Sequence, residues 1–448
     1  MIFNRGRELL TAARAKLRPF ARSLAHRNYR LFIFGQGISL IGTWMQQVAL
    51  GWLVYDLTGS PFWLGIVGFC GQIPAFFIAP VAGVLTDRWN LRGTLLVTQS
   101  ACMLQAAMLA ALDVTGAIAV WQIVPLSLFS GVVNAFDMPA RQAFLVHMVD
   151  RKEDLPNAIA LNSSLVNGTR LIGPAISGLV IDLAGEATCF LLNALSYVAV
   201  LWALWAMRIA PRQAGSRSED VWRGLRTGLG YAFGFAPIRD ILLLLGLMSL
   251  CFMPLGVLMP VFAREILQGG PDTLGLMTGA SGVGALGAAL YLASRSSVLG
   301  LGRQIAMSAA GLGLSMFAFS LSRDLGLSLA LLLFTGYCTM LGMAASNTLL
   351  QTIVDEDKRG RVMGLYATAF MGMAPMGSLL AGLLADALGA PAALRVCGAL
   401  SLAGGVAFAL RLPELRNQVR PIYARMGIIP EIATAIGAST QLRMPPEQ

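Results

Sequence analysis

Charged side chains inside otherwise apolar stretches are the residues of this sequence best placed to do chemistry. Arg170 lies about halfway along an apolar run over Ala158–Leu183, and Asp137 lies in the preceding run, four residues before Arg141. A charge at membrane depth is costly, so it usually faces a bundle interior or water and has a partner. Asp137 is the predicted partner of Arg170, although its spacing from Arg141 also allows a local pair on one helix face. The pattern indicates either a structural ion pair or a site that binds or couples a solute.

The surroundings of these charges are polar as well. Asn134 and Asn167 lie three residues before Asp137 and Arg170, which is the spacing of neighbours on one helix face. We therefore expect both amides to share a network with the two charges. Carboxylates deep inside apolar runs are scarce, so Asp137 is the candidate for proton coupling.

A second group of charges follows Gly83. Asp87, Arg88 and Arg92 lie in a very short connection between two apolar runs. A carboxylate there can accept hydrogen bonds from the free amides at the beginning of another helix and favours the positive end of its dipole. Gly83 allows a neighbouring helix to approach closely. These four residues therefore either contact another helix or form an ordinary charged loop.

Several other chemistries lack their residues in this sequence. It contains no Gly-x-x-x-x-Gly-Lys-Ser/Thr motif for nucleotide phosphates and no Cys-x-x-Cys spacing for zinc. Each of the six cysteines lies in an apolar run of its own, which is typical of buried free thiols. The two histidines have no partner at ligand spacing. We predict a protein that is not an enzyme and binds no cofactor or metal.

The elements that position these residues are long apolar helices. The chain has 448 residues, of which 56% are hydrophobic and 12% charged, whereas a soluble protein carries about 25% charged residues. Continuous apolar runs of about 20 residues indicate helices that span a bilayer. The fold class is therefore all-α membrane protein with twelve transmembrane helices, predicted at Leu31–Tyr55, Phe62–Thr86, Thr94–Leu112, Ala119–Ala140, Ala158–Leu183, Thr188–Met207, Ile241–Ala263, Thr273–Ala293, Gln304–Leu321, Leu325–Val354, Val362–Leu388 and Ala392–Leu410.

The distribution of positive charge predicts the orientation. All but four of the 33 Lys and Arg residues fall on one side of the predicted bundle, the exceptions being Arg170, Arg264, Arg323 and Arg395. Positive residues favour the cytoplasmic side, so both termini are expected there, in a multi-pass protein of the cytoplasmic membrane. The net charge of +10 is spread over many short connections rather than one soluble surface, which excludes a nucleic-acid patch.

The chain divides into two similar halves. Gly59, Pro61, Leu64 and Gly65 recur 210 residues later as Gly269, Pro271, Leu274 and Gly275. We predict a basic segment over 1–28, six-helix halves over 29–207 and 241–411, a linker over 208–240 and a peripheral or disordered tail over 412–448. Parallel repeats of this kind place a substrate site between the halves, near the middle of the membrane.

Three motifs resemble a known family. The segment from Gly83 to Arg92 resembles the loop between helices 2 and 3 of the major facilitator superfamily of secondary transporters. The helix-packing residues Gly173, Pro174 and Gly178 resemble the Gly-Pro motif of its antiporters. The stretches 134–144, 155–164 and 170–174 are similar to the enterobactin-exporter-like branch, which exports siderophores or drugs.

This resemblance implies a monomeric exporter of a small amphiphilic molecule that works by alternating access, with a proton as coupling ion. Asp87, together with Gly83, Arg88 and Arg92, would form a gate by contacting the helix that begins near residue 361. The cavity would be lined by four helices that offer Trp44, Gln46, Gln47, Asn134, Met253, Tyr337 and Asn347. Two alternatives remain open, an importer of the same fold and a non-transporting membrane scaffold.

Overall fold

The first half of the chain folds into six long helices. The computed structural model describes residues 22–149, 151–208, 229–295 and 297–428, except for the side chains of residues 79, 80, 83, 84, 87, 88 and 152. It contains no strand in that part of the chain. The helices are α2 (Arg27–Thr58), α3 (Pro61–Arg88), α4 (Leu91–Val114), α5 (Val120–Leu145), α6 (Leu155–Ala184) and α7 (Glu186–Ala206).

The second half repeats this plan with one interruption. Its helices are α9 (Ala236–Val261), which continues as the π-helical turn η4 (Phe262–Ile266), α10 (Pro271–Ala293), α11 (Leu301–Leu321), α12 (Leu325–Ile353), α13 (Arg359–Met371), α14 (Met373–Leu388) and α15 (Ala390–Arg425). The break between α13 and α14 falls at Gly372. Pro375 explains it, because proline cannot donate to the carbonyl four residues earlier. Together α13 and α14 cross the bundle once, so the twelve predicted helices are confirmed.

Eleven of these segments, within the described residues, are long and apolar enough to span a membrane. The exception is α2, which has 32 residues. Its length exceeds the hydrocarbon core, but its polar side chains lower its hydropathy. In the middle of the helix they include Gln36, Ser39, Thr43, Gln46 and Gln47.

Short connections make successive helices antiparallel. Gly59 ends α2 in the left-handed conformation with φ of 58°, and Pro61 begins α3 two residues later. Glycine adopts this conformation without the strain that a side chain brings. At the other end, the Asn90 side chain accepts a hydrogen bond of 3.1 Å from the amide of Gly93 and caps α4. We call the end at which α2, α4 and α6 begin the positive face, and the other end the opposite face.

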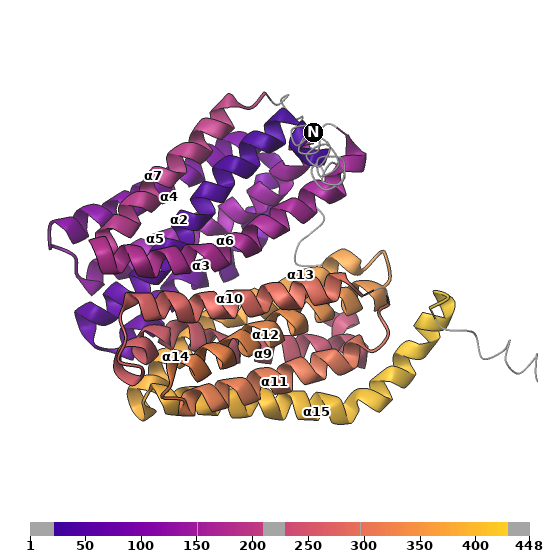
Figure 1. Ribbon diagram of the computed structural model, residues 1–448. Coiled ribbons are helices and arrows are strands. Elements are labelled where there is room, and N and C mark those ends of the chain that lie inside the picture. Colours follow the sequence, from indigo (N-terminus) through magenta and orange to yellow (C-terminus); the bar gives the residue numbers. More distant parts are fainter. Residues whose placement is uncertain (1–21, 150, 209–228, 296, 429–448) are drawn as a thin grey trace, which may run out of the picture.

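The halves meet along two seams, which we define by the helices that form them. In one seam α6 lies against α10, and in the other α3 lies against α14. The repeat relates α3 to α10 and α6 to α13–α14, so the two seams are equivalent contacts. Figure 1 shows the ribbons of the halves side by side near the opposite face and diverging toward the end marked N.

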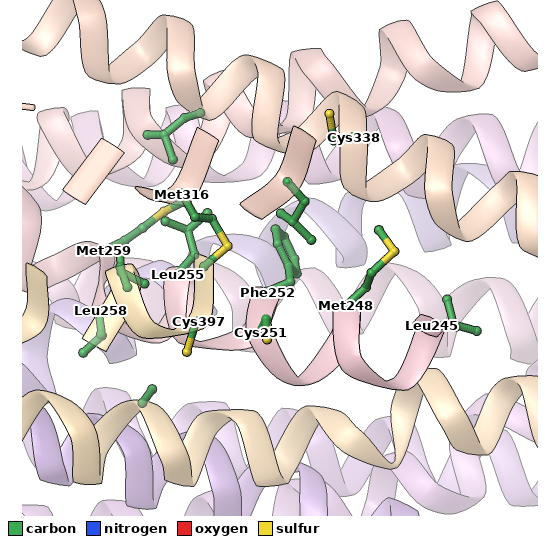
Figure 2. Close-up of a cluster of buried hydrophobic side chains, with 14 of the residues drawn as sticks. Leu245, Met248, Cys251, Phe252, Leu255, Leu258, Met259, Met316, Cys338 and Cys397 are labelled. Atoms are coloured by element: carbon green, nitrogen blue, oxygen red, sulfur yellow. The ribbon is translucent and has the colours of Figure 1, made fainter. Parts of the chain in front are cut away.

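The second half is built around α9. The most apolar 18 residues of this segment and its π-helical turn have a mean hydropathy of 2.5, and 67% of them are buried. Figure 2 shows α9 side chains such as Met248, Phe252 and Leu255 gathered with Met316 and Cys338 from α11 and α12. A helix that is apolar on all sides belongs in the interior of a bundle. Five of the six cysteines are buried and Cys70 is half-buried, as predicted for free thiols.

The segment after the last span is ordered farther than predicted. The helix α15 continues through Pro413 and Pro421 to Arg425, and Leu412, Leu415 and Val419 are buried on its inner side. The prediction that the tail is disordered is therefore wrong for residues 412–425. The alternative prediction, a peripheral segment, describes this part better. Burial of one apolar residue about every turn explains why the helix persists.

Candidate functional site

The seam between α6 and α10 depends on glycines in close contact. A Cβ atom added to Gly178 would lie 2.6 Å from the carbonyl oxygen of Pro271 and 3.2 Å from the Cα of Gly275. At Gly173 it would lie 2.5 Å from the Cβ of Trp44 on α2. Two of the predicted helix-packing residues, Gly173 and Gly178, therefore allow backbones to approach at distances that any side chain would prevent.

The second seam, between α3 and α14, has the same character. A Cβ atom at Gly65 would lie 2.7 Å from the Cα of Gly382. The Gln72 amide also donates a hydrogen bond of 3.1 Å across this seam to the Ser378 hydroxyl. Both seams thus combine small residues with few hydrogen bonds.

Two polar contacts close the opposite face. Arg264 in the turn after α9 forms an ion pair with Asp56 at the end of α2, and the Tyr55 hydroxyl donates to Glu265. The Arg264 guanidinium also lies 5.9 Å from the centroid of the Trp52 ring, within cation–π range. We call these residues the outer latch. Arg264 is one of the four basic residues off the positive side of the predicted bundle, and its pairing with Asp56 was not predicted from the sequence.

Arg170 has a different partner from the predicted one. Its guanidinium lies 5.5 Å from the centroid of the Trp44 ring on α2, and among the described residues no carboxylate lies within ion-pair distance of it. The predicted Arg170–Asp137 pair is therefore wrong. Arg170 lies next to Leu171, whose Cα would be 3.2 Å from a Cβ atom at Gly282 on α10. The cation thus lies where α2, α6 and α10 meet.

Asp137 is used within the first half instead. Its carboxylate pairs with Arg141 on the same helix and accepts hydrogen bonds of 2.7 Å from both Thr98 and Gln99 on α4. Asp137 is 2% exposed, so α5 and α4 share a buried and fully bonded charge. The local pair at four-residue spacing was the second alternative of the sequence analysis, and it is the one that forms.

The two asparagines do not join these charges. Asn134 donates to the Ser130 hydroxyl at 3.3 Å, and Asn167 donates to the carbonyl of Ser163 at 2.8 Å. Both hydrogen bonds stay within one helix, so the predicted shared network is wrong. A side chain that bonds to its own preceding turn satisfies itself locally.

Trp44 and Gln47 lie on the side of α2 that faces the second half. They share a helix face with Gly51 and Tyr55. A Cβ atom at Gly51 would lie 3.5 Å from the Cγ of Pro260 on α9, and Tyr55 bonds to Glu265. Trp44 and Gln47 lie on this same side of α2 but closer to the positive face. They are therefore located where the halves diverge.

The remaining cavity candidates are Gln46 on α2 and Tyr337 and Asn347 on α12. Gln46 donates to Gln105 at 2.9 Å and accepts from Asn193 at 2.8 Å, so its side chain is bonded inside the first half. Its predicted position in the cavity is therefore wrong. Tyr337 is half-buried, with its ring 6.3 Å from that of Tyr291. Asn347 is half-buried and accepts a hydrogen bond from Gln351.

The predicted gate lies mostly outside the described side chains. Gly83, Asp87 and Arg88 are among the positions at which the structure describes only the backbone. Their role in a gate therefore stays a prediction. Arg92 donates a hydrogen bond of 2.7 Å to the carbonyl of Trp205 and thus connects α4 to α7 within the first half.

The matched family agrees with this architecture. Residues 18–431 match the family described as transmembrane secretion effector, so the chain belongs to this family of the major facilitator superfamily. The resemblance found in the sequence is confirmed, and the chain is a transporter rather than an enzyme.

Its curated relatives include siderophore and drug transporters. The staphyloferrin A transporter of Staphylococcus aureus is 26% identical over 80% of this chain and 90% of that protein. The multidrug efflux pump Tap of Mycolicibacterium fortuitum is 26% identical over 86% of this chain and 96% of that protein. The macrolide efflux protein A of Streptococcus pyogenes is 23% identical over 81% and 92%.

Solved structures share the fold. A bacterial homologue of the iron transporter ferroportin in its inward-facing state has a TM-score of 0.65 and 16% identity, covering 86% of this chain and 98% of that one. The nucleoside transporter NupG has a TM-score of 0.66 and 12% identity, covering 86% of this chain and 99% of that one. At these identities the likeness concerns the fold alone.

Proposed function

We propose that this transporter is a secondary active exporter of small amphiphilic molecules, either siderophores or drug-like compounds. Three of its relatives are named for staphyloferrin A transport, for multidrug efflux and for macrolide efflux. The single observation that carries the proposal is Arg170, a membrane-embedded cation beside Trp44 with no carboxylate partner among the described residues. Charged residues within membrane spans usually face the bundle interior or a water-filled cavity and mark substrate or ion pathways.

The place where the halves are joined supports alternating access as the mechanism. The outer latch and both glycine seams lie toward the opposite face. The halves over 29–207 and 241–411 would rock about these contacts. In this state the substrate site would be closed at the opposite face, and the positive face, which we propose to be cytoplasmic, would give access to Trp44, Gln47, Tyr337 and Asn347.

The gate prediction completes the cycle. Asp87, together with Gly83, Arg88 and Arg92, would close the positive face by binding the beginning of α13 when the outer latch opens. A carboxylate at a helix N-terminus is stabilised by about 0.3–1 kcal/mol at an exposed site. A contact of this size is weak enough to break in every cycle.

Proton coupling is assigned to the Asp137–Arg141 pair. Protonation of a buried carboxylate removes the charge that its guanidinium partner neutralises. Arg141 is the more exposed member, with its side chain 26% exposed against 3% for Asp137. It can turn toward water when the pair breaks, and the α4–α5 contact would change. The monomer would suffice for this cycle.

The test follows accumulation of a fluorescent amphiphile and of a ferric siderophore in bacteria that lack their own efflux pumps. We expect lower accumulation in cells that express the chain, and we expect a protonophore, Asp87→Asn or Arg170→Gln to abolish the difference. Equal membrane levels of each variant must be verified by immunoblot. Higher accumulation in expressing cells would favour an importer. Equal accumulation of every compound in cells with and without the chain would favour a scaffold.

A further inference from the structure

A groove outside the transport path lies between α2 and α7 near the positive face. It has a volume of about 260 Å³ and is lined by Arg30, Phe34 and Ile38 of α2 and by Ala199, Trp202 and Ala203 of α7. Arg30 and Ile38 are eight residues apart, so the groove runs for about 12 Å along α2. Its walls are open to the surroundings, since Phe34 is 64% and Trp202 60% exposed.

Small residues create the floor of this groove. A Cβ atom at Gly35 would lie 3.0 Å from the carbonyl oxygen of Ala199 and 3.1 Å from the Cβ of Ala203. The two helices are therefore in contact beneath the groove, while the larger side chains of Phe34 and Trp202 stand at its sides. A long apolar groove that is closed beneath by helix–helix contact can hold a lipid acyl chain.

The rim toward the positive face is cationic. Arg27, Arg30 and Arg208 are exposed there, and the backbone of Arg208 is fixed by hydrogen bonds of 2.9 and 3.1 Å with the Asn28 side chain. None of the groove-lining residues is acidic. Asp154 at this end of the molecule is engaged with His26 at 3.0 Å.

The second half provides an internal comparison. At the offset of the repeat, Arg30 corresponds to Asp240 on α9, and α9 packs against α15 as α2 packs against α7. Asp240 lies 3.0 Å from Arg239 and 2.9 Å from Arg411, so the positive charge there is neutralised within the chain. At the equivalent place in the first half, Arg30 takes the position that Asp240 has in the second half.

We propose that the groove between α2 and α7 is a binding site for an anionic phospholipid. One acyl chain would lie along Phe34, Ile38 and Trp202, and the phosphate would meet Arg30 at the headgroup level, with Arg27 and Arg208 beside it. Guanidinium groups bind phosphate through paired hydrogen bonds. Tryptophan favours the same depth of the bilayer. This site is independent of the transported substrate.

The test is native mass spectrometry of the purified full-length chain with palmitoyl-oleoyl phosphatidylglycerol or phosphatidylcholine. We expect retention of phosphatidylglycerol to exceed that of phosphatidylcholine, and Arg30→Gln to lower this preference about fivefold, which corresponds to about 1 kcal/mol per arginine near anionic lipid. Ala199→Phe, which fills the groove, should reduce retention of both lipids. Arg303→Gln is the matched control, since Arg303 is exposed on α11 at the same face but lines no part of the groove.

Three outcomes would overturn the proposal. Equal losses of preference in Arg30→Gln and Arg303→Gln would mean diffuse attraction to the whole face. A preference that survives Arg30→Gln but disappears on deletion of residues 2–21 would assign the lipid to that segment. A dimer that Ala199→Phe dissociates would mean that a second copy occupies the groove. Thermal unfolding of each variant verifies that the fold is intact.

Discussion

Arg264 and Asp56 are joined across the two halves of the chain at the opposite face, although they lie 208 residues apart. Their side chains are 46% and 49% exposed, so water screens the pair. Exposed ion pairs contribute about 0.2–1 kcal/mol. A contact of this strength can bias two conformations without locking either.

Breaking this pair should favour opening of the opposite face. We expect Asp56→Asn to raise the population with an open seam by up to about fivefold, since the pair contributes at most about 1 kcal/mol. The measurement is labelling of Ser378→Cys by a membrane-impermeant maleimide, because Ser378 is fully buried in the seam between α3 and α14. The charge swap Asp56→Arg with Arg264→Asp should restore slow labelling. Labelling that stays unchanged in Asp56→Asn would mean that the pair does not bias opening.

The glycine contact between α6 and α10 should be intolerant of a side chain. Gly178→Leu places its Cβ against the backbone of Pro271, which cannot move aside as a flexible side chain can. Overpacking of this kind costs about 1–3 kcal/mol, so transport should fall about tenfold or more. The matched control is Gly168→Leu on the same helix, where a Cβ atom would meet nothing within 4 Å. Equal transport by the two variants would show that the seam need not close tightly.

The ring of Trp44 should position Arg170. Trp44→Phe keeps an aromatic face for the guanidinium, whereas Trp44→Leu removes it. Cation–π contacts contribute about 0.5–2 kcal/mol, so the KM for an anionic amphiphile should rise about two- to thirtyfold in Trp44→Leu and much less in Trp44→Phe. Transport assays with an anionic and a neutral substrate separate this effect from loss of packing, which would affect both substrates alike.

Asp137 should be needed for coupling more than for movement of the substrate. In Asp137→Asn the charge that pairs with Arg141 is lost, while an acceptor for Thr98 and Gln99 remains. We expect loss of transport driven by an imposed pH gradient, with substrate exchange across vesicles retained. The free energy of unfolding should fall by about 1–3 kcal/mol, because a polar partner is lost in a buried site.

The control for this prediction is Asp182→Asn at the far end of α6, which should affect neither exchange nor gradient-driven transport. If Asp137→Asn also abolishes exchange at normal protein levels, the residue supports the fold or the substrate path rather than the proton.

The sequence predicted the helices well because length and hydropathy are local properties. All twelve spans, from Leu31–Tyr55 to Ala392–Leu410, match helices of the structure, and the pairing of Asp137 with Arg141 depends on spacing along one helix. The partner of Arg170 was not predictable in this way. Trp44 lies on another helix, and helix rotation is set by tertiary contacts.

Contacts between distant segments were the main omission. Asp56 and Arg264 are opposite charges at helix ends on one face of the predicted bundle, which was the available signal for the outer latch. Gln46 and Gln47 are adjacent in sequence, yet one bonds within the first half and the other turns toward the second. Successive residues of a helix point in directions about 100° apart, and this rotation decides which neighbour each glutamine meets. Composition does not reveal it.

The two seams have an energetic consequence for a carrier that must return to its starting state in every cycle. Gly65, Gly178, Gly275 and Gly382 bring backbones together through dispersion contacts, with one described hydrogen bond between Gln72 and Ser378. Backbone groups within a helix remain bonded to each other, so parting the seams leaves almost no donor or acceptor stranded, and lipid or water can replace the lost contacts. In the proposed alternating-access cycle the two conformations can therefore lie close in free energy, and a single bound molecule or proton would be enough to shift the equilibrium between them.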